Sequence, residues 1–465
     1  MGLISFLSNN SSETFFLPAH SRGNALPDEL KELLEDKPGV WDLPELYEIG
    51  GPLISEGAIA ESQKSSASKI GVKRCWYGVN GATGLLQSSL IALARPGQAI
   101  LMPRNIHKSC IQACLIAGII PIFFDVPFLS DRGHTSVFDS KWLQKVFQEA
   151  NLLEEEITAV ALVNPTYHGY SADMDSLIKE IHSHSLPVLV DEAHGAYFLS
   201  QARSDLPKSS LSFGADLVVH SLHKSAPGLV QSAALWLQGE KVDPFIIERS
   251  LGLFQTSSPS SLLLASCESS IKELISPKGK EKLISRIEEA EYLSEYLISK
   301  DVPLLTSPDP FRIILHTSKF GLSGIDVDKK FIKKGIIGEL PEPGTLTFCL
   351  GFSSHKGAGK KLVRIWNEIL TNSYASEKIP FFKRPPFGFV SKPFKTCSSS
   401  WGAAFEKVSL KDSVGRISVE MICPYPPGIP LLVPGEVLDQ ARVDWLIEQR
   451  CLWPEEIPDY VRVIS

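Results

Sequence analysis

Short apolar runs alternate with amphipathic stretches through roughly the first half of the chain. The runs are rich in β-branched residues and short, which is typical of buried parallel strands. Between them, apolar residues recur at helical spacing. The pattern predicts strands at 72–79, 99–102, 119–126, 157–164, 188–193, 216–219 and 232–238. It predicts helices at 27–34, 81–94, 106–117, 141–151 and 174–184.

This alternation predicts an α/β fold with helices on both faces of a mostly parallel, seven-stranded-type sheet. We expect residues 1–50 to form an N-terminal arm and residues 51–275 a large domain built on the sheet. Residues 276–465 would form a linker helix and a smaller α+β domain. In that part the pattern predicts helices within 259–300 and at 325–334 and 357–371, strands at 313–317, 345–352, 416–423 and 431–433, and a loop at 376–397.

Composition narrows the function classes. Apolar residues make up 43% and charged residues 21% of the 465 residues, as in globular proteins. The net charge of −7 and the pI of about 5.9 favour neither nucleic acid nor an anionic membrane surface as a partner. The longest apolar run, at 113–124, is interrupted by Gly118 and Pro121 and is too short to span a bilayer.

The eight cysteines are scattered and show no metal-ligand spacing, so we expect no metal site. Cys110 and Cys114 are close together, but they lie in an apolar helical run. The first 16 residues lack a basic start and a sustained apolar core, unlike a signal peptide. Together these features predict a cytoplasmic protein with buried, reduced thiols.

A single turn carries the first candidate chemistry. Residues 216–219 form a predicted strand, and Pro227 and Gly228 prevent a helix from following the turn directly. Lys224 therefore lies on a loop at the carboxyl end of a strand, where open α/β sheets bind ligands. Such a lysine is either solvated or a Schiff-base lysine that holds a carbonyl cofactor.

Four other loops follow strands of the same sheet. The turn at 80–84 begins a helix, and Gly81, Ala82 and Thr83 there form a potential phosphate cradle. Each of the other three offers one group: Asp191, a carboxylate for a protonated ring nitrogen; His107, an imidazole that can stack on a flat ring; and Thr166, a hydroxyl. Taken singly, each also has a structural reading as a cap, turn or surface residue. Taken together, they point to pyridoxal 5′-phosphate (PLP) as the cofactor.

With those residues in view, the chain resembles the Orn/Lys/Arg decarboxylases, a family of fold-type-I PLP enzymes. The resemblance rests on Pro-Ala-His at 18–20, Gly-Ala-Thr at 81–83, Pro-Arg-Asn-Ile-His-Lys-Ser at 103–109, Asn-Pro-Thr-Tyr at 164–167, Val-Asp-Glu-Ala-His-Gly at 190–195, Ser-Leu-His-Lys at 221–224, Thr-Ser-Ser-Pro at 256–259, Tyr-Pro-Pro-Gly-Ile-Pro at 425–430 and Pro-Gly-Glu at 434–436. The family commonly has Pro-Gly-His-Lys in the first motif, where this chain has Ala19 and Ser21. The chain resembles the short form of the family, which lacks an N-terminal receiver-like domain.

The resemblance implies a role for each matching residue. Lys224 would carry the cofactor, Asp191 would pair with the pyridine nitrogen, and His107 would stack on the ring. The phosphate would be held by Ala82, Thr83, Ser221 and His223. Ala193 would pack on the opposite ring face, and His194 would line the site. Thr256 would reach the phosphate of the neighbouring subunit, which makes a homodimer with shared sites the expected assembly.

The implied activity is decarboxylation of lysine, arginine or ornithine, with Lys224 or His223 returning the proton to Cα. The segment 425–430 and Glu420 would lie near the substrate, and Glu420 or Glu436 could pair with its terminal cation. Three alternatives stay open: an aminotransferase, an aldolase-like enzyme, or a regulatory descendant without catalysis. An aminotransferase commonly binds the substrate carboxylate with a C-terminal arginine, but neither Arg416 nor Arg442 lies in such a pattern.

Overall fold

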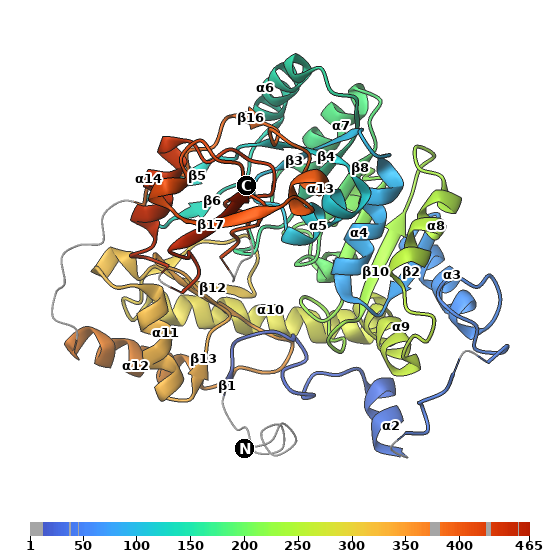
Figure 1. Cartoon of the computed structure of the whole chain (residues 1–465). Coiled ribbons are helices and arrows are strands. Elements are labelled where there is room, and N and C mark those ends of the chain that lie inside the picture. The colour runs from blue at the N-terminus through green and yellow to red at the C-terminus, as the bar shows by residue number, and fades with distance from the viewer. Residues whose placement is uncertain (1–12, 37–38, 45, 373–381, 425–428, 454) are drawn as a thin grey trace.

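The computed structural model describes residues 13–36, 39–44, 46–372, 382–424, 429–453 and 455–465. Its centre is an eight-stranded sheet in the order β16-β4-β3-β7-β8-β9-β10-β2 (Figure 1). The strands are β2 (Arg74–Gly78), β3 (Ala99–Pro103), β4 (Ile120–Phe124), β7 (Ile157–Val163), β8 (Val188–Asp191), β9 (Leu217–Ser221), β10 (Ala233–Leu237) and β16 (Val390–Ser391). The predicted α/β fold class is confirmed, with one strand more than the seven expected.

Five neighbouring strands, β4, β3, β7, β8 and β9, run parallel. Because β10 is antiparallel to both β9 and β2, β2 runs in the same direction as those five. The carboxyl ends of six strands therefore lie along one edge of the sheet. The added edge strand, β16, comes from the C-terminal part of the chain and pairs antiparallel with β4.

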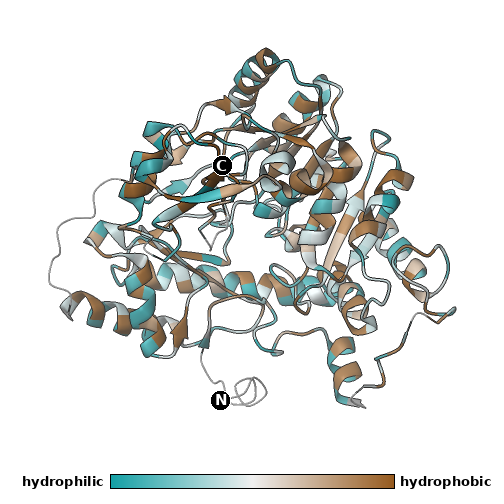
Figure 2. Cartoon of the chain, viewed as in Figure 1, coloured by the Kyte–Doolittle hydropathy of each residue, from teal (hydrophilic) through white to brown (hydrophobic). Residues whose placement is uncertain are grey.

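Helices cover both faces of the sheet, as the alternating pattern predicts. The apolar side chains of α4 (Gly81–Leu93), α5 (Lys108–Ala117) and α8 (Pro244–Phe254) form a core on one face. The other face is covered by α6 (Ser140–Ala150), α7 (Met174–Ser183), α9 (Ser261–Ile275) and the small α3 (Ala58–Ile70). The strands between these layers are predominantly hydrophobic (Figure 2). Neither α3 nor α8 was predicted from the pattern, although Asp243 and Pro244 are a typical N-cap and first residue of α8.

The long helix α10 (Pro277–Ile298) leads from α9 to a four-stranded antiparallel sheet (Figure 1). Its strands, in the order β11-β12-β15-β14, are β11 (Leu304–Leu305), β12 (Arg312–Leu315), β15 (Leu346–Cys349) and β14 (Leu340–Pro341). α11 (Gly324–Lys333) and α12 (Ala358–Asn372) belong to this part. The N-terminal β1 (Glu13–Thr14) pairs with β13 (Ile336–Ile337), so the start of the chain joins it too. The predicted boundaries at residues 50 and 275 stay predictions.

The last part of the chain forms a separate apolar cluster. It contains α14 (Gln440–Gln449) and the antiparallel pair β17 (Phe405–Ser409) and β18 (Tyr460–Ile464). The remaining short elements are α2 (Asp28–Asp36), α13 (Cys397–Trp401), β5 (Phe128–Leu129) and β6 (His134–Thr135).

Two predictions for this region are wrong. Residues 416–423 and 431–433 are not strands, because they make only isolated bridges, such as Ile422 to Leu432. Their apolar side chains divide between two cores: Ile422, Leu431 and Leu432 pack in the C-terminal cluster, while Met421 and Val433 pack in the core beside the large sheet. The predicted loop at 376–397 contains β16, and its residues 376–381 lie outside the described part of the chain.

The cysteine prediction is confirmed in most positions. All eight cysteines are unpaired, and six of them are buried, while Cys423 is half-buried and Cys451 is exposed. Within the described ranges, no helix combines the length and the apolar character needed to cross a bilayer.

Candidate active site

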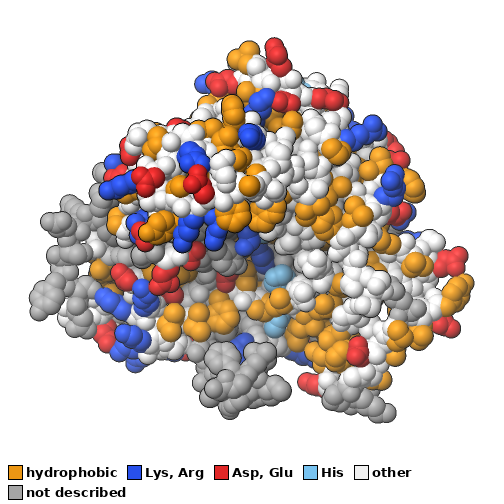
Figure 3. All heavy atoms as spheres, in the orientation of Figure 1, with side chains coloured by type: hydrophobic (Ala, Val, Ile, Leu, Met, Phe, Trp, Pro, Cys, Tyr) orange, Lys and Arg blue, Asp and Glu red, His pale blue; other side chains and the backbone are white. Residues whose placement is uncertain are grey.

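The carboxyl edge of the large sheet delivers side chains from five loops to one cavity of about 240 Å³. The loops follow β2, β3, β7, β8 and β9. Eleven of the twelve residues predicted to bind the cofactor line it: Gly81, Ala82, Thr83, His107, Thr166, Asp191, Ala193, His194, Ser221, His223 and Lys224. In the space-filling view this face is hollowed, and histidine side chains are visible inside the hollow (Figure 3).

The twelfth residue, Thr256, is exposed just after α8 and does not line this cavity. Its predicted role toward a neighbouring subunit therefore stays a prediction. Of the predicted segment 425–430, Ile429 lines the cavity, while 425–428 lie outside the described residues.

Neither predicted substrate carboxylate lines the cavity. Glu420 forms an ion pair with Arg462 at 2.6 Å near the surface. Glu436 is buried between Arg104, at 2.8 Å, and Arg442, at 3.0 Å. Within this chain both carboxylates are occupied by structural ion pairs.

Lys224 contacts the imidazole of His194, with 3.2 Å between Nζ and Nε2. The guanidinium of Arg312 is 3.3 Å from the other ring nitrogen, Nδ1. Arginine is always a donor, and a neutral imidazole accepts at only one nitrogen. Nε2 therefore carries the proton and donates it to Lys224, which must be a neutral amine to accept it.

The electrostatics of the site agree with this assignment. Burial lowers the pKa of Lys224, although the charge of Asp191 opposes the shift. Burial also holds the pKa of His194 well below its usual range, and the charges of Lys224 and Arg312 add to the effect. A neutral lysine amine is the form that attacks a carbonyl.

Asp191 is the last residue of β8 and is 7% exposed. The backbone N–H of Ala193 donates to its Oδ1 over 3.1 Å. Burial raises the pKa of this carboxyl, and the charge of Lys224 opposes the shift. A cation placed against Asp191 would therefore be strongly stabilised, as the pairing with a protonated ring nitrogen requires.

A buried network fixes the strand ends on which Asp191 and Lys224 lie. Trp236 on β10 donates to His220 on β9 over 2.8 Å, and the other nitrogen of His220 bonds to Glu192 over 2.8 Å. Glu192 directly follows β8 and also accepts from the backbone N–H of Ser210 over 2.7 Å. Three adjacent strands are thereby tied together just behind the cavity.

His107 is positioned as the N-cap of α5. Its Nδ1 accepts the backbone N–H of Ser109 over 3.2 Å, so Nε2 carries the ring proton. Burial lowers the pKa of His107 to about 4, and the charge of Lys224 contributes. His107 is thus a neutral, fixed aromatic ring at the cavity wall.

The first turn of α4 leaves hydrogen-bond donors open toward the cavity. Asn80 makes no side-chain cap, and the N–H groups of Ala82 and Thr83 have no acceptor among the described residues. Ser221 and His223 lie on the same cavity wall, joined by 3.1 Å between Oγ and Nδ1. An uncapped helix N-terminus beside hydroxyl and imidazole donors is suited to a phosphate group.

Several residues that line or support the cavity were not given a role from the sequence. Asn105, Thr135, Tyr167 and His168 line it, together with Leu86, Val163 and Pro165. Tyr167 and Asn105 lie inside motifs that the chain shares with the family, so their place in the site could have been predicted from the sequence. Arg312 and Glu339, which accepts a hydrogen bond from the Tyr167 hydroxyl, are distant in sequence and carried no local signal.

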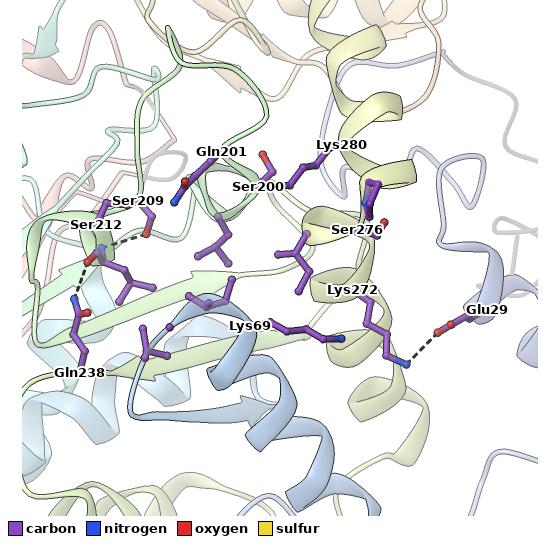
Figure 4. A pocket seen from close by; sticks show the side chains of 17 residues that line it. Glu29, Lys69, Ser200, Gln201, Ser209, Ser212, Gln238, Lys272, Ser276 and Lys280 are labelled. Carbon is purple, nitrogen blue, oxygen red and sulfur yellow. Dashed lines mark hydrogen bonds and ion pairs between the residues drawn. The ribbon is translucent and has the colours of Figure 1, made fainter.

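A larger recess, of about 780 Å³, lies at the opposite, amino edge of the sheet, next to Val72 and Gln238. Serine, glutamine and lysine side chains line it, and Lys272 points toward Glu29 (Figure 4). It contains none of the predicted groups, so we place the chemistry at the smaller cavity.

Comparisons with known proteins identify the family. The model of the Orn/Lys/Arg decarboxylase major domain matches residues 1–306, and the model of the family's C-terminal domain matches residues 381–458. The chain belongs to the Orn/Lys/Arg decarboxylase family. The resemblance predicted from the motifs is confirmed, and with it the lyase class at the level of the family.

Named relatives of this Orn/Lys/Arg decarboxylase family member extend over nearly the whole chain. It is 28% identical to an arginine decarboxylase of Bacillus subtilis, covering 93% of this chain and 90% of that protein. It is 26% identical to an arginine decarboxylase of Halalkalibacterium halodurans, covering 96% and 92%. It is 21% identical to the constitutive lysine decarboxylase of Escherichia coli, covering 84% and 67%.

Solved structures show the same fold. The constitutive lysine decarboxylase of Escherichia coli superposes with a TM-score of 0.77 over 100% of this chain and 81% of that one, at 18% identity. Lysine decarboxylase A from Pseudomonas aeruginosa superposes with a TM-score of 0.74, covering 100% and 80%, at 16% identity. An SPT enzyme solved with PLP superposes with a TM-score of 0.55, covering 77% and 86%, at 14% identity.

The lowered pKa of His107 predicts a loss of stability in mild acid. The folded-state pKa is about 4, below the ordinary histidine value of 6.5, so only the unfolded state takes up this proton as the pH falls from 6.5 to 4. His107→Asn removes the titration and keeps a good N-cap. Between pH 7 and pH 4.5, the variant should lose about 2 kcal/mol less stability than the wild type. Urea unfolding of protein freed of small molecules measures this, and identical pH dependence in both proteins would refute the assignment.

Proposed function

We propose that this protein is a PLP-dependent decarboxylase of a basic amino acid, either arginine, lysine or ornithine. The observation that carries the proposal is the convergence of eleven predicted residues around one cavity with Lys224 held as a neutral amine. Family membership and the arginine and lysine decarboxylases among the relatives support it.

The residues fit PLP by the chemistry of their donor set. The open N–H groups of Ala82 and Thr83, with Ser221 and His223, would hold its phosphate. Asp191 would keep a proton on the ring nitrogen, His107 and Ala193 would pack on the ring, and Lys224 would carry the cofactor. When bound, PLP supplies a conjugated ring that accepts the electron pair released as CO₂ leaves.

The chain's own residues then handle orientation and the proton. We assign the return of a proton to Cα to Lys224, because its neutral amine faces the cavity and can first take up the proton that the substrate's ammonium group loses on binding. Burial lowers the pKa of His223 to about 4, so this ring is neutral near pH 7 and serves better as a hydrogen-bond donor than as an acid.

Transamination is the second candidate, and one observation disfavours it. Among the residues that the structure describes, no arginine lines the cavity to hold a substrate carboxylate. Arg416 pairs with Glu406, and Arg442 pairs with the buried Glu436. A carboxylate without a cationic clamp is easier to expel as CO₂ than one held by an ion pair.

The test of the proposal is CO₂ release from arginine, lysine and ornithine, measured side by side with added PLP. We expect release from at least one of them, and a loss of about 10³-fold or more in Lys224→Ala, since nucleophile and proton carrier vanish together. Release from none, with pyridoxamine phosphate formed instead, would establish transamination and overturn the proposal.

We further propose a homodimer in the cytoplasm in which Thr256 completes the phosphate site of the partner subunit. The exposure of Thr256 away from the cavity of its own chain supports the shared site. The eight unpaired cysteines are consistent with a reducing compartment.

Hybrid dimers test the shared site. A dimer of one Lys224→Ala subunit and one Thr256→Ala subunit retains one site with both Lys224 and the partner's threonine intact. We expect wild-type activity per remaining Lys224, well above that of the Thr256→Ala homodimer. Activity per site equal to that of the Thr256→Ala homodimer would place Thr256 in its own subunit's site or outside any site.

A further inference from the structure

A second cavity, of about 120 Å³, adjoins the one that contains Lys224. Both cavities are lined by Thr135, His168 and Ile429, so they meet at these three residues. The second cavity extends toward Glu342, between the β5–β6 hairpin and α14. It lies where a substrate side chain could extend from the reaction centre.

Glu342 is a buried carboxylate in the wall of this second cavity, with a residue exposure of 6%. Its Oε2 is 2.7 Å from Nε2 of His168, 3.0 Å from Nε2 of His134 and 3.3 Å from the Thr345 hydroxyl. Oε1 accepts no hydrogen bond from any residue that the structure describes. A carboxylate oxygen on a largely buried side chain that lines a cavity and has no protein donor is placed to accept a hydrogen bond from a ligand.

A metal ion is one reading of this group, since the three ligand atoms lie within 4.8 Å of one another. The geometry disfavours it. The rings of His134 and His168 are stacked, with centroids 3.6 Å apart and planes 17° from parallel. Their in-plane lone pairs therefore run side by side, whereas a tetrahedral metal requires them to converge.

The other charges around the second cavity are already paired. Arg132 contacts Asp131 through two nitrogens, at 3.0 and 2.7 Å. Lys383 contacts Glu448 at 2.6 Å. Glu342 has no lysine or arginine partner among the described residues, because its contacts are two imidazoles and a hydroxyl.

Glu342 stays ionised in this setting. Burial would raise the pKa of its carboxyl, but the contacts with His134 and His168 outweigh burial and leave the pKa well below its usual range. Burial and the neighbouring His168 lower the pKa of His134 to about 4.

The rest of the lining suits an alkyl chain that ends in a cation. Phe128, Phe382, Trp445 and Trp453 contribute aromatic surface. Aromatic faces bind methylene stems and attract ammonium or guanidinium groups through their π-electrons.

We propose that Oε1 of Glu342 binds the terminal cation of the substrate side chain, with His134 and His168 as the positioning residues that hold its Oε2. The inference rests on the proposed function, because it assigns specificity within the same site. It replaces Glu420 and Glu436, whose carboxylates are engaged elsewhere in this chain. Arginine, lysine and ornithine share this chemistry and differ in the length and shape of the cationic end.

The test measures, by calorimetry, how tightly four amino acids bind to the PLP-loaded protein. They are arginine, lysine, ornithine and norleucine, and norleucine lacks the terminal cation. The variants are Glu342→Gln, which keeps the shape and removes the charge, Glu342→Asp, which keeps the charge, and Glu420→Gln as a matched surface control. We expect the preference for the best cationic ligand over norleucine to fall about 100-fold in Glu342→Gln and to be retained in part in Glu342→Asp. Norleucine binding should change less than threefold, and Glu420→Gln should behave as wild type.

A purely structural role predicts a lower melting temperature in Glu342→Gln with an unchanged cation preference, and that result would overturn the inference. Stoichiometric metal in the purified protein that is lost in Glu342→Gln would also overturn it. If Glu342→Gln does not fold, Glu342→Asp must still weaken cation binding selectively, and an unchanged preference there counts against the inference.

Cation-selective binding through Glu342 without CO₂ release would leave the inference standing while the proposed reaction fails. CO₂ release by a protein whose cation preference is unchanged in Glu342→Gln would leave the proposed reaction standing while the inference fails.

Discussion

The common direction of six strands in the large sheet is the constraint on which the site depends. Because β2, β3, β7, β8 and β9 all end at one edge, five loops that are far apart in sequence meet at a single cavity. Each loop contributes between one and three of the predicted residues. The buried Glu192–His220–Trp236 network then ties β8, β9 and β10 together directly behind the cavity, where a small shift would separate Asp191 from Lys224.

Burial determines the charge states of the side chains at this edge. It lowers the pKa of Lys224, and it keeps His107 and His223 neutral, with pKa values of about 4. The hydrogen-bond direction from Arg312 through His194 leads to the same neutral amine by a separate argument. The site is therefore suited to a cofactor with three features. Its neutral lysine suits a carbonyl, its neutral histidine ring at the wall suits a flat ring, and its carboxylate without a cation suits a protonated nitrogen.

The sequence was sufficient to predict the strands and helices around this edge, because buried strands and amphipathic helices have distinct periods. It also predicted eleven cavity residues, because they lie at or just after the end of a strand or, for Ala193, His194, Ser221 and His223, because the resemblance to the family implies their roles. The alternation of apolar residues at 416–423 predicts a strand, but these residues make only isolated bridges, and Ile422 packs in the C-terminal cluster. Glu342, His134 and Arg312 could not be assigned from the sequence, because their roles arise from contacts between segments more than 100 residues apart.

The two adjoining cavities differ in the chemical groups that line them. The one that contains Lys224 carries the groups for cofactor and bond cleavage, while the one that contains Glu342 carries an anion at a distance from the chemistry. Their junction at His168 would let one substrate occupy both. Such a division would separate the reaction, common to the family, from the selection of the amino acid.

The central claim is that Lys224 holds PLP. Sodium borohydride reduction of the PLP-loaded protein, which fixes a lysine-bound cofactor permanently, followed by peptide mass spectrometry, tests it most directly. The account predicts a phosphopyridoxyl group on Lys224 in nearly every chain. A group found on another lysine, or none at all with PLP in excess, would contradict the account.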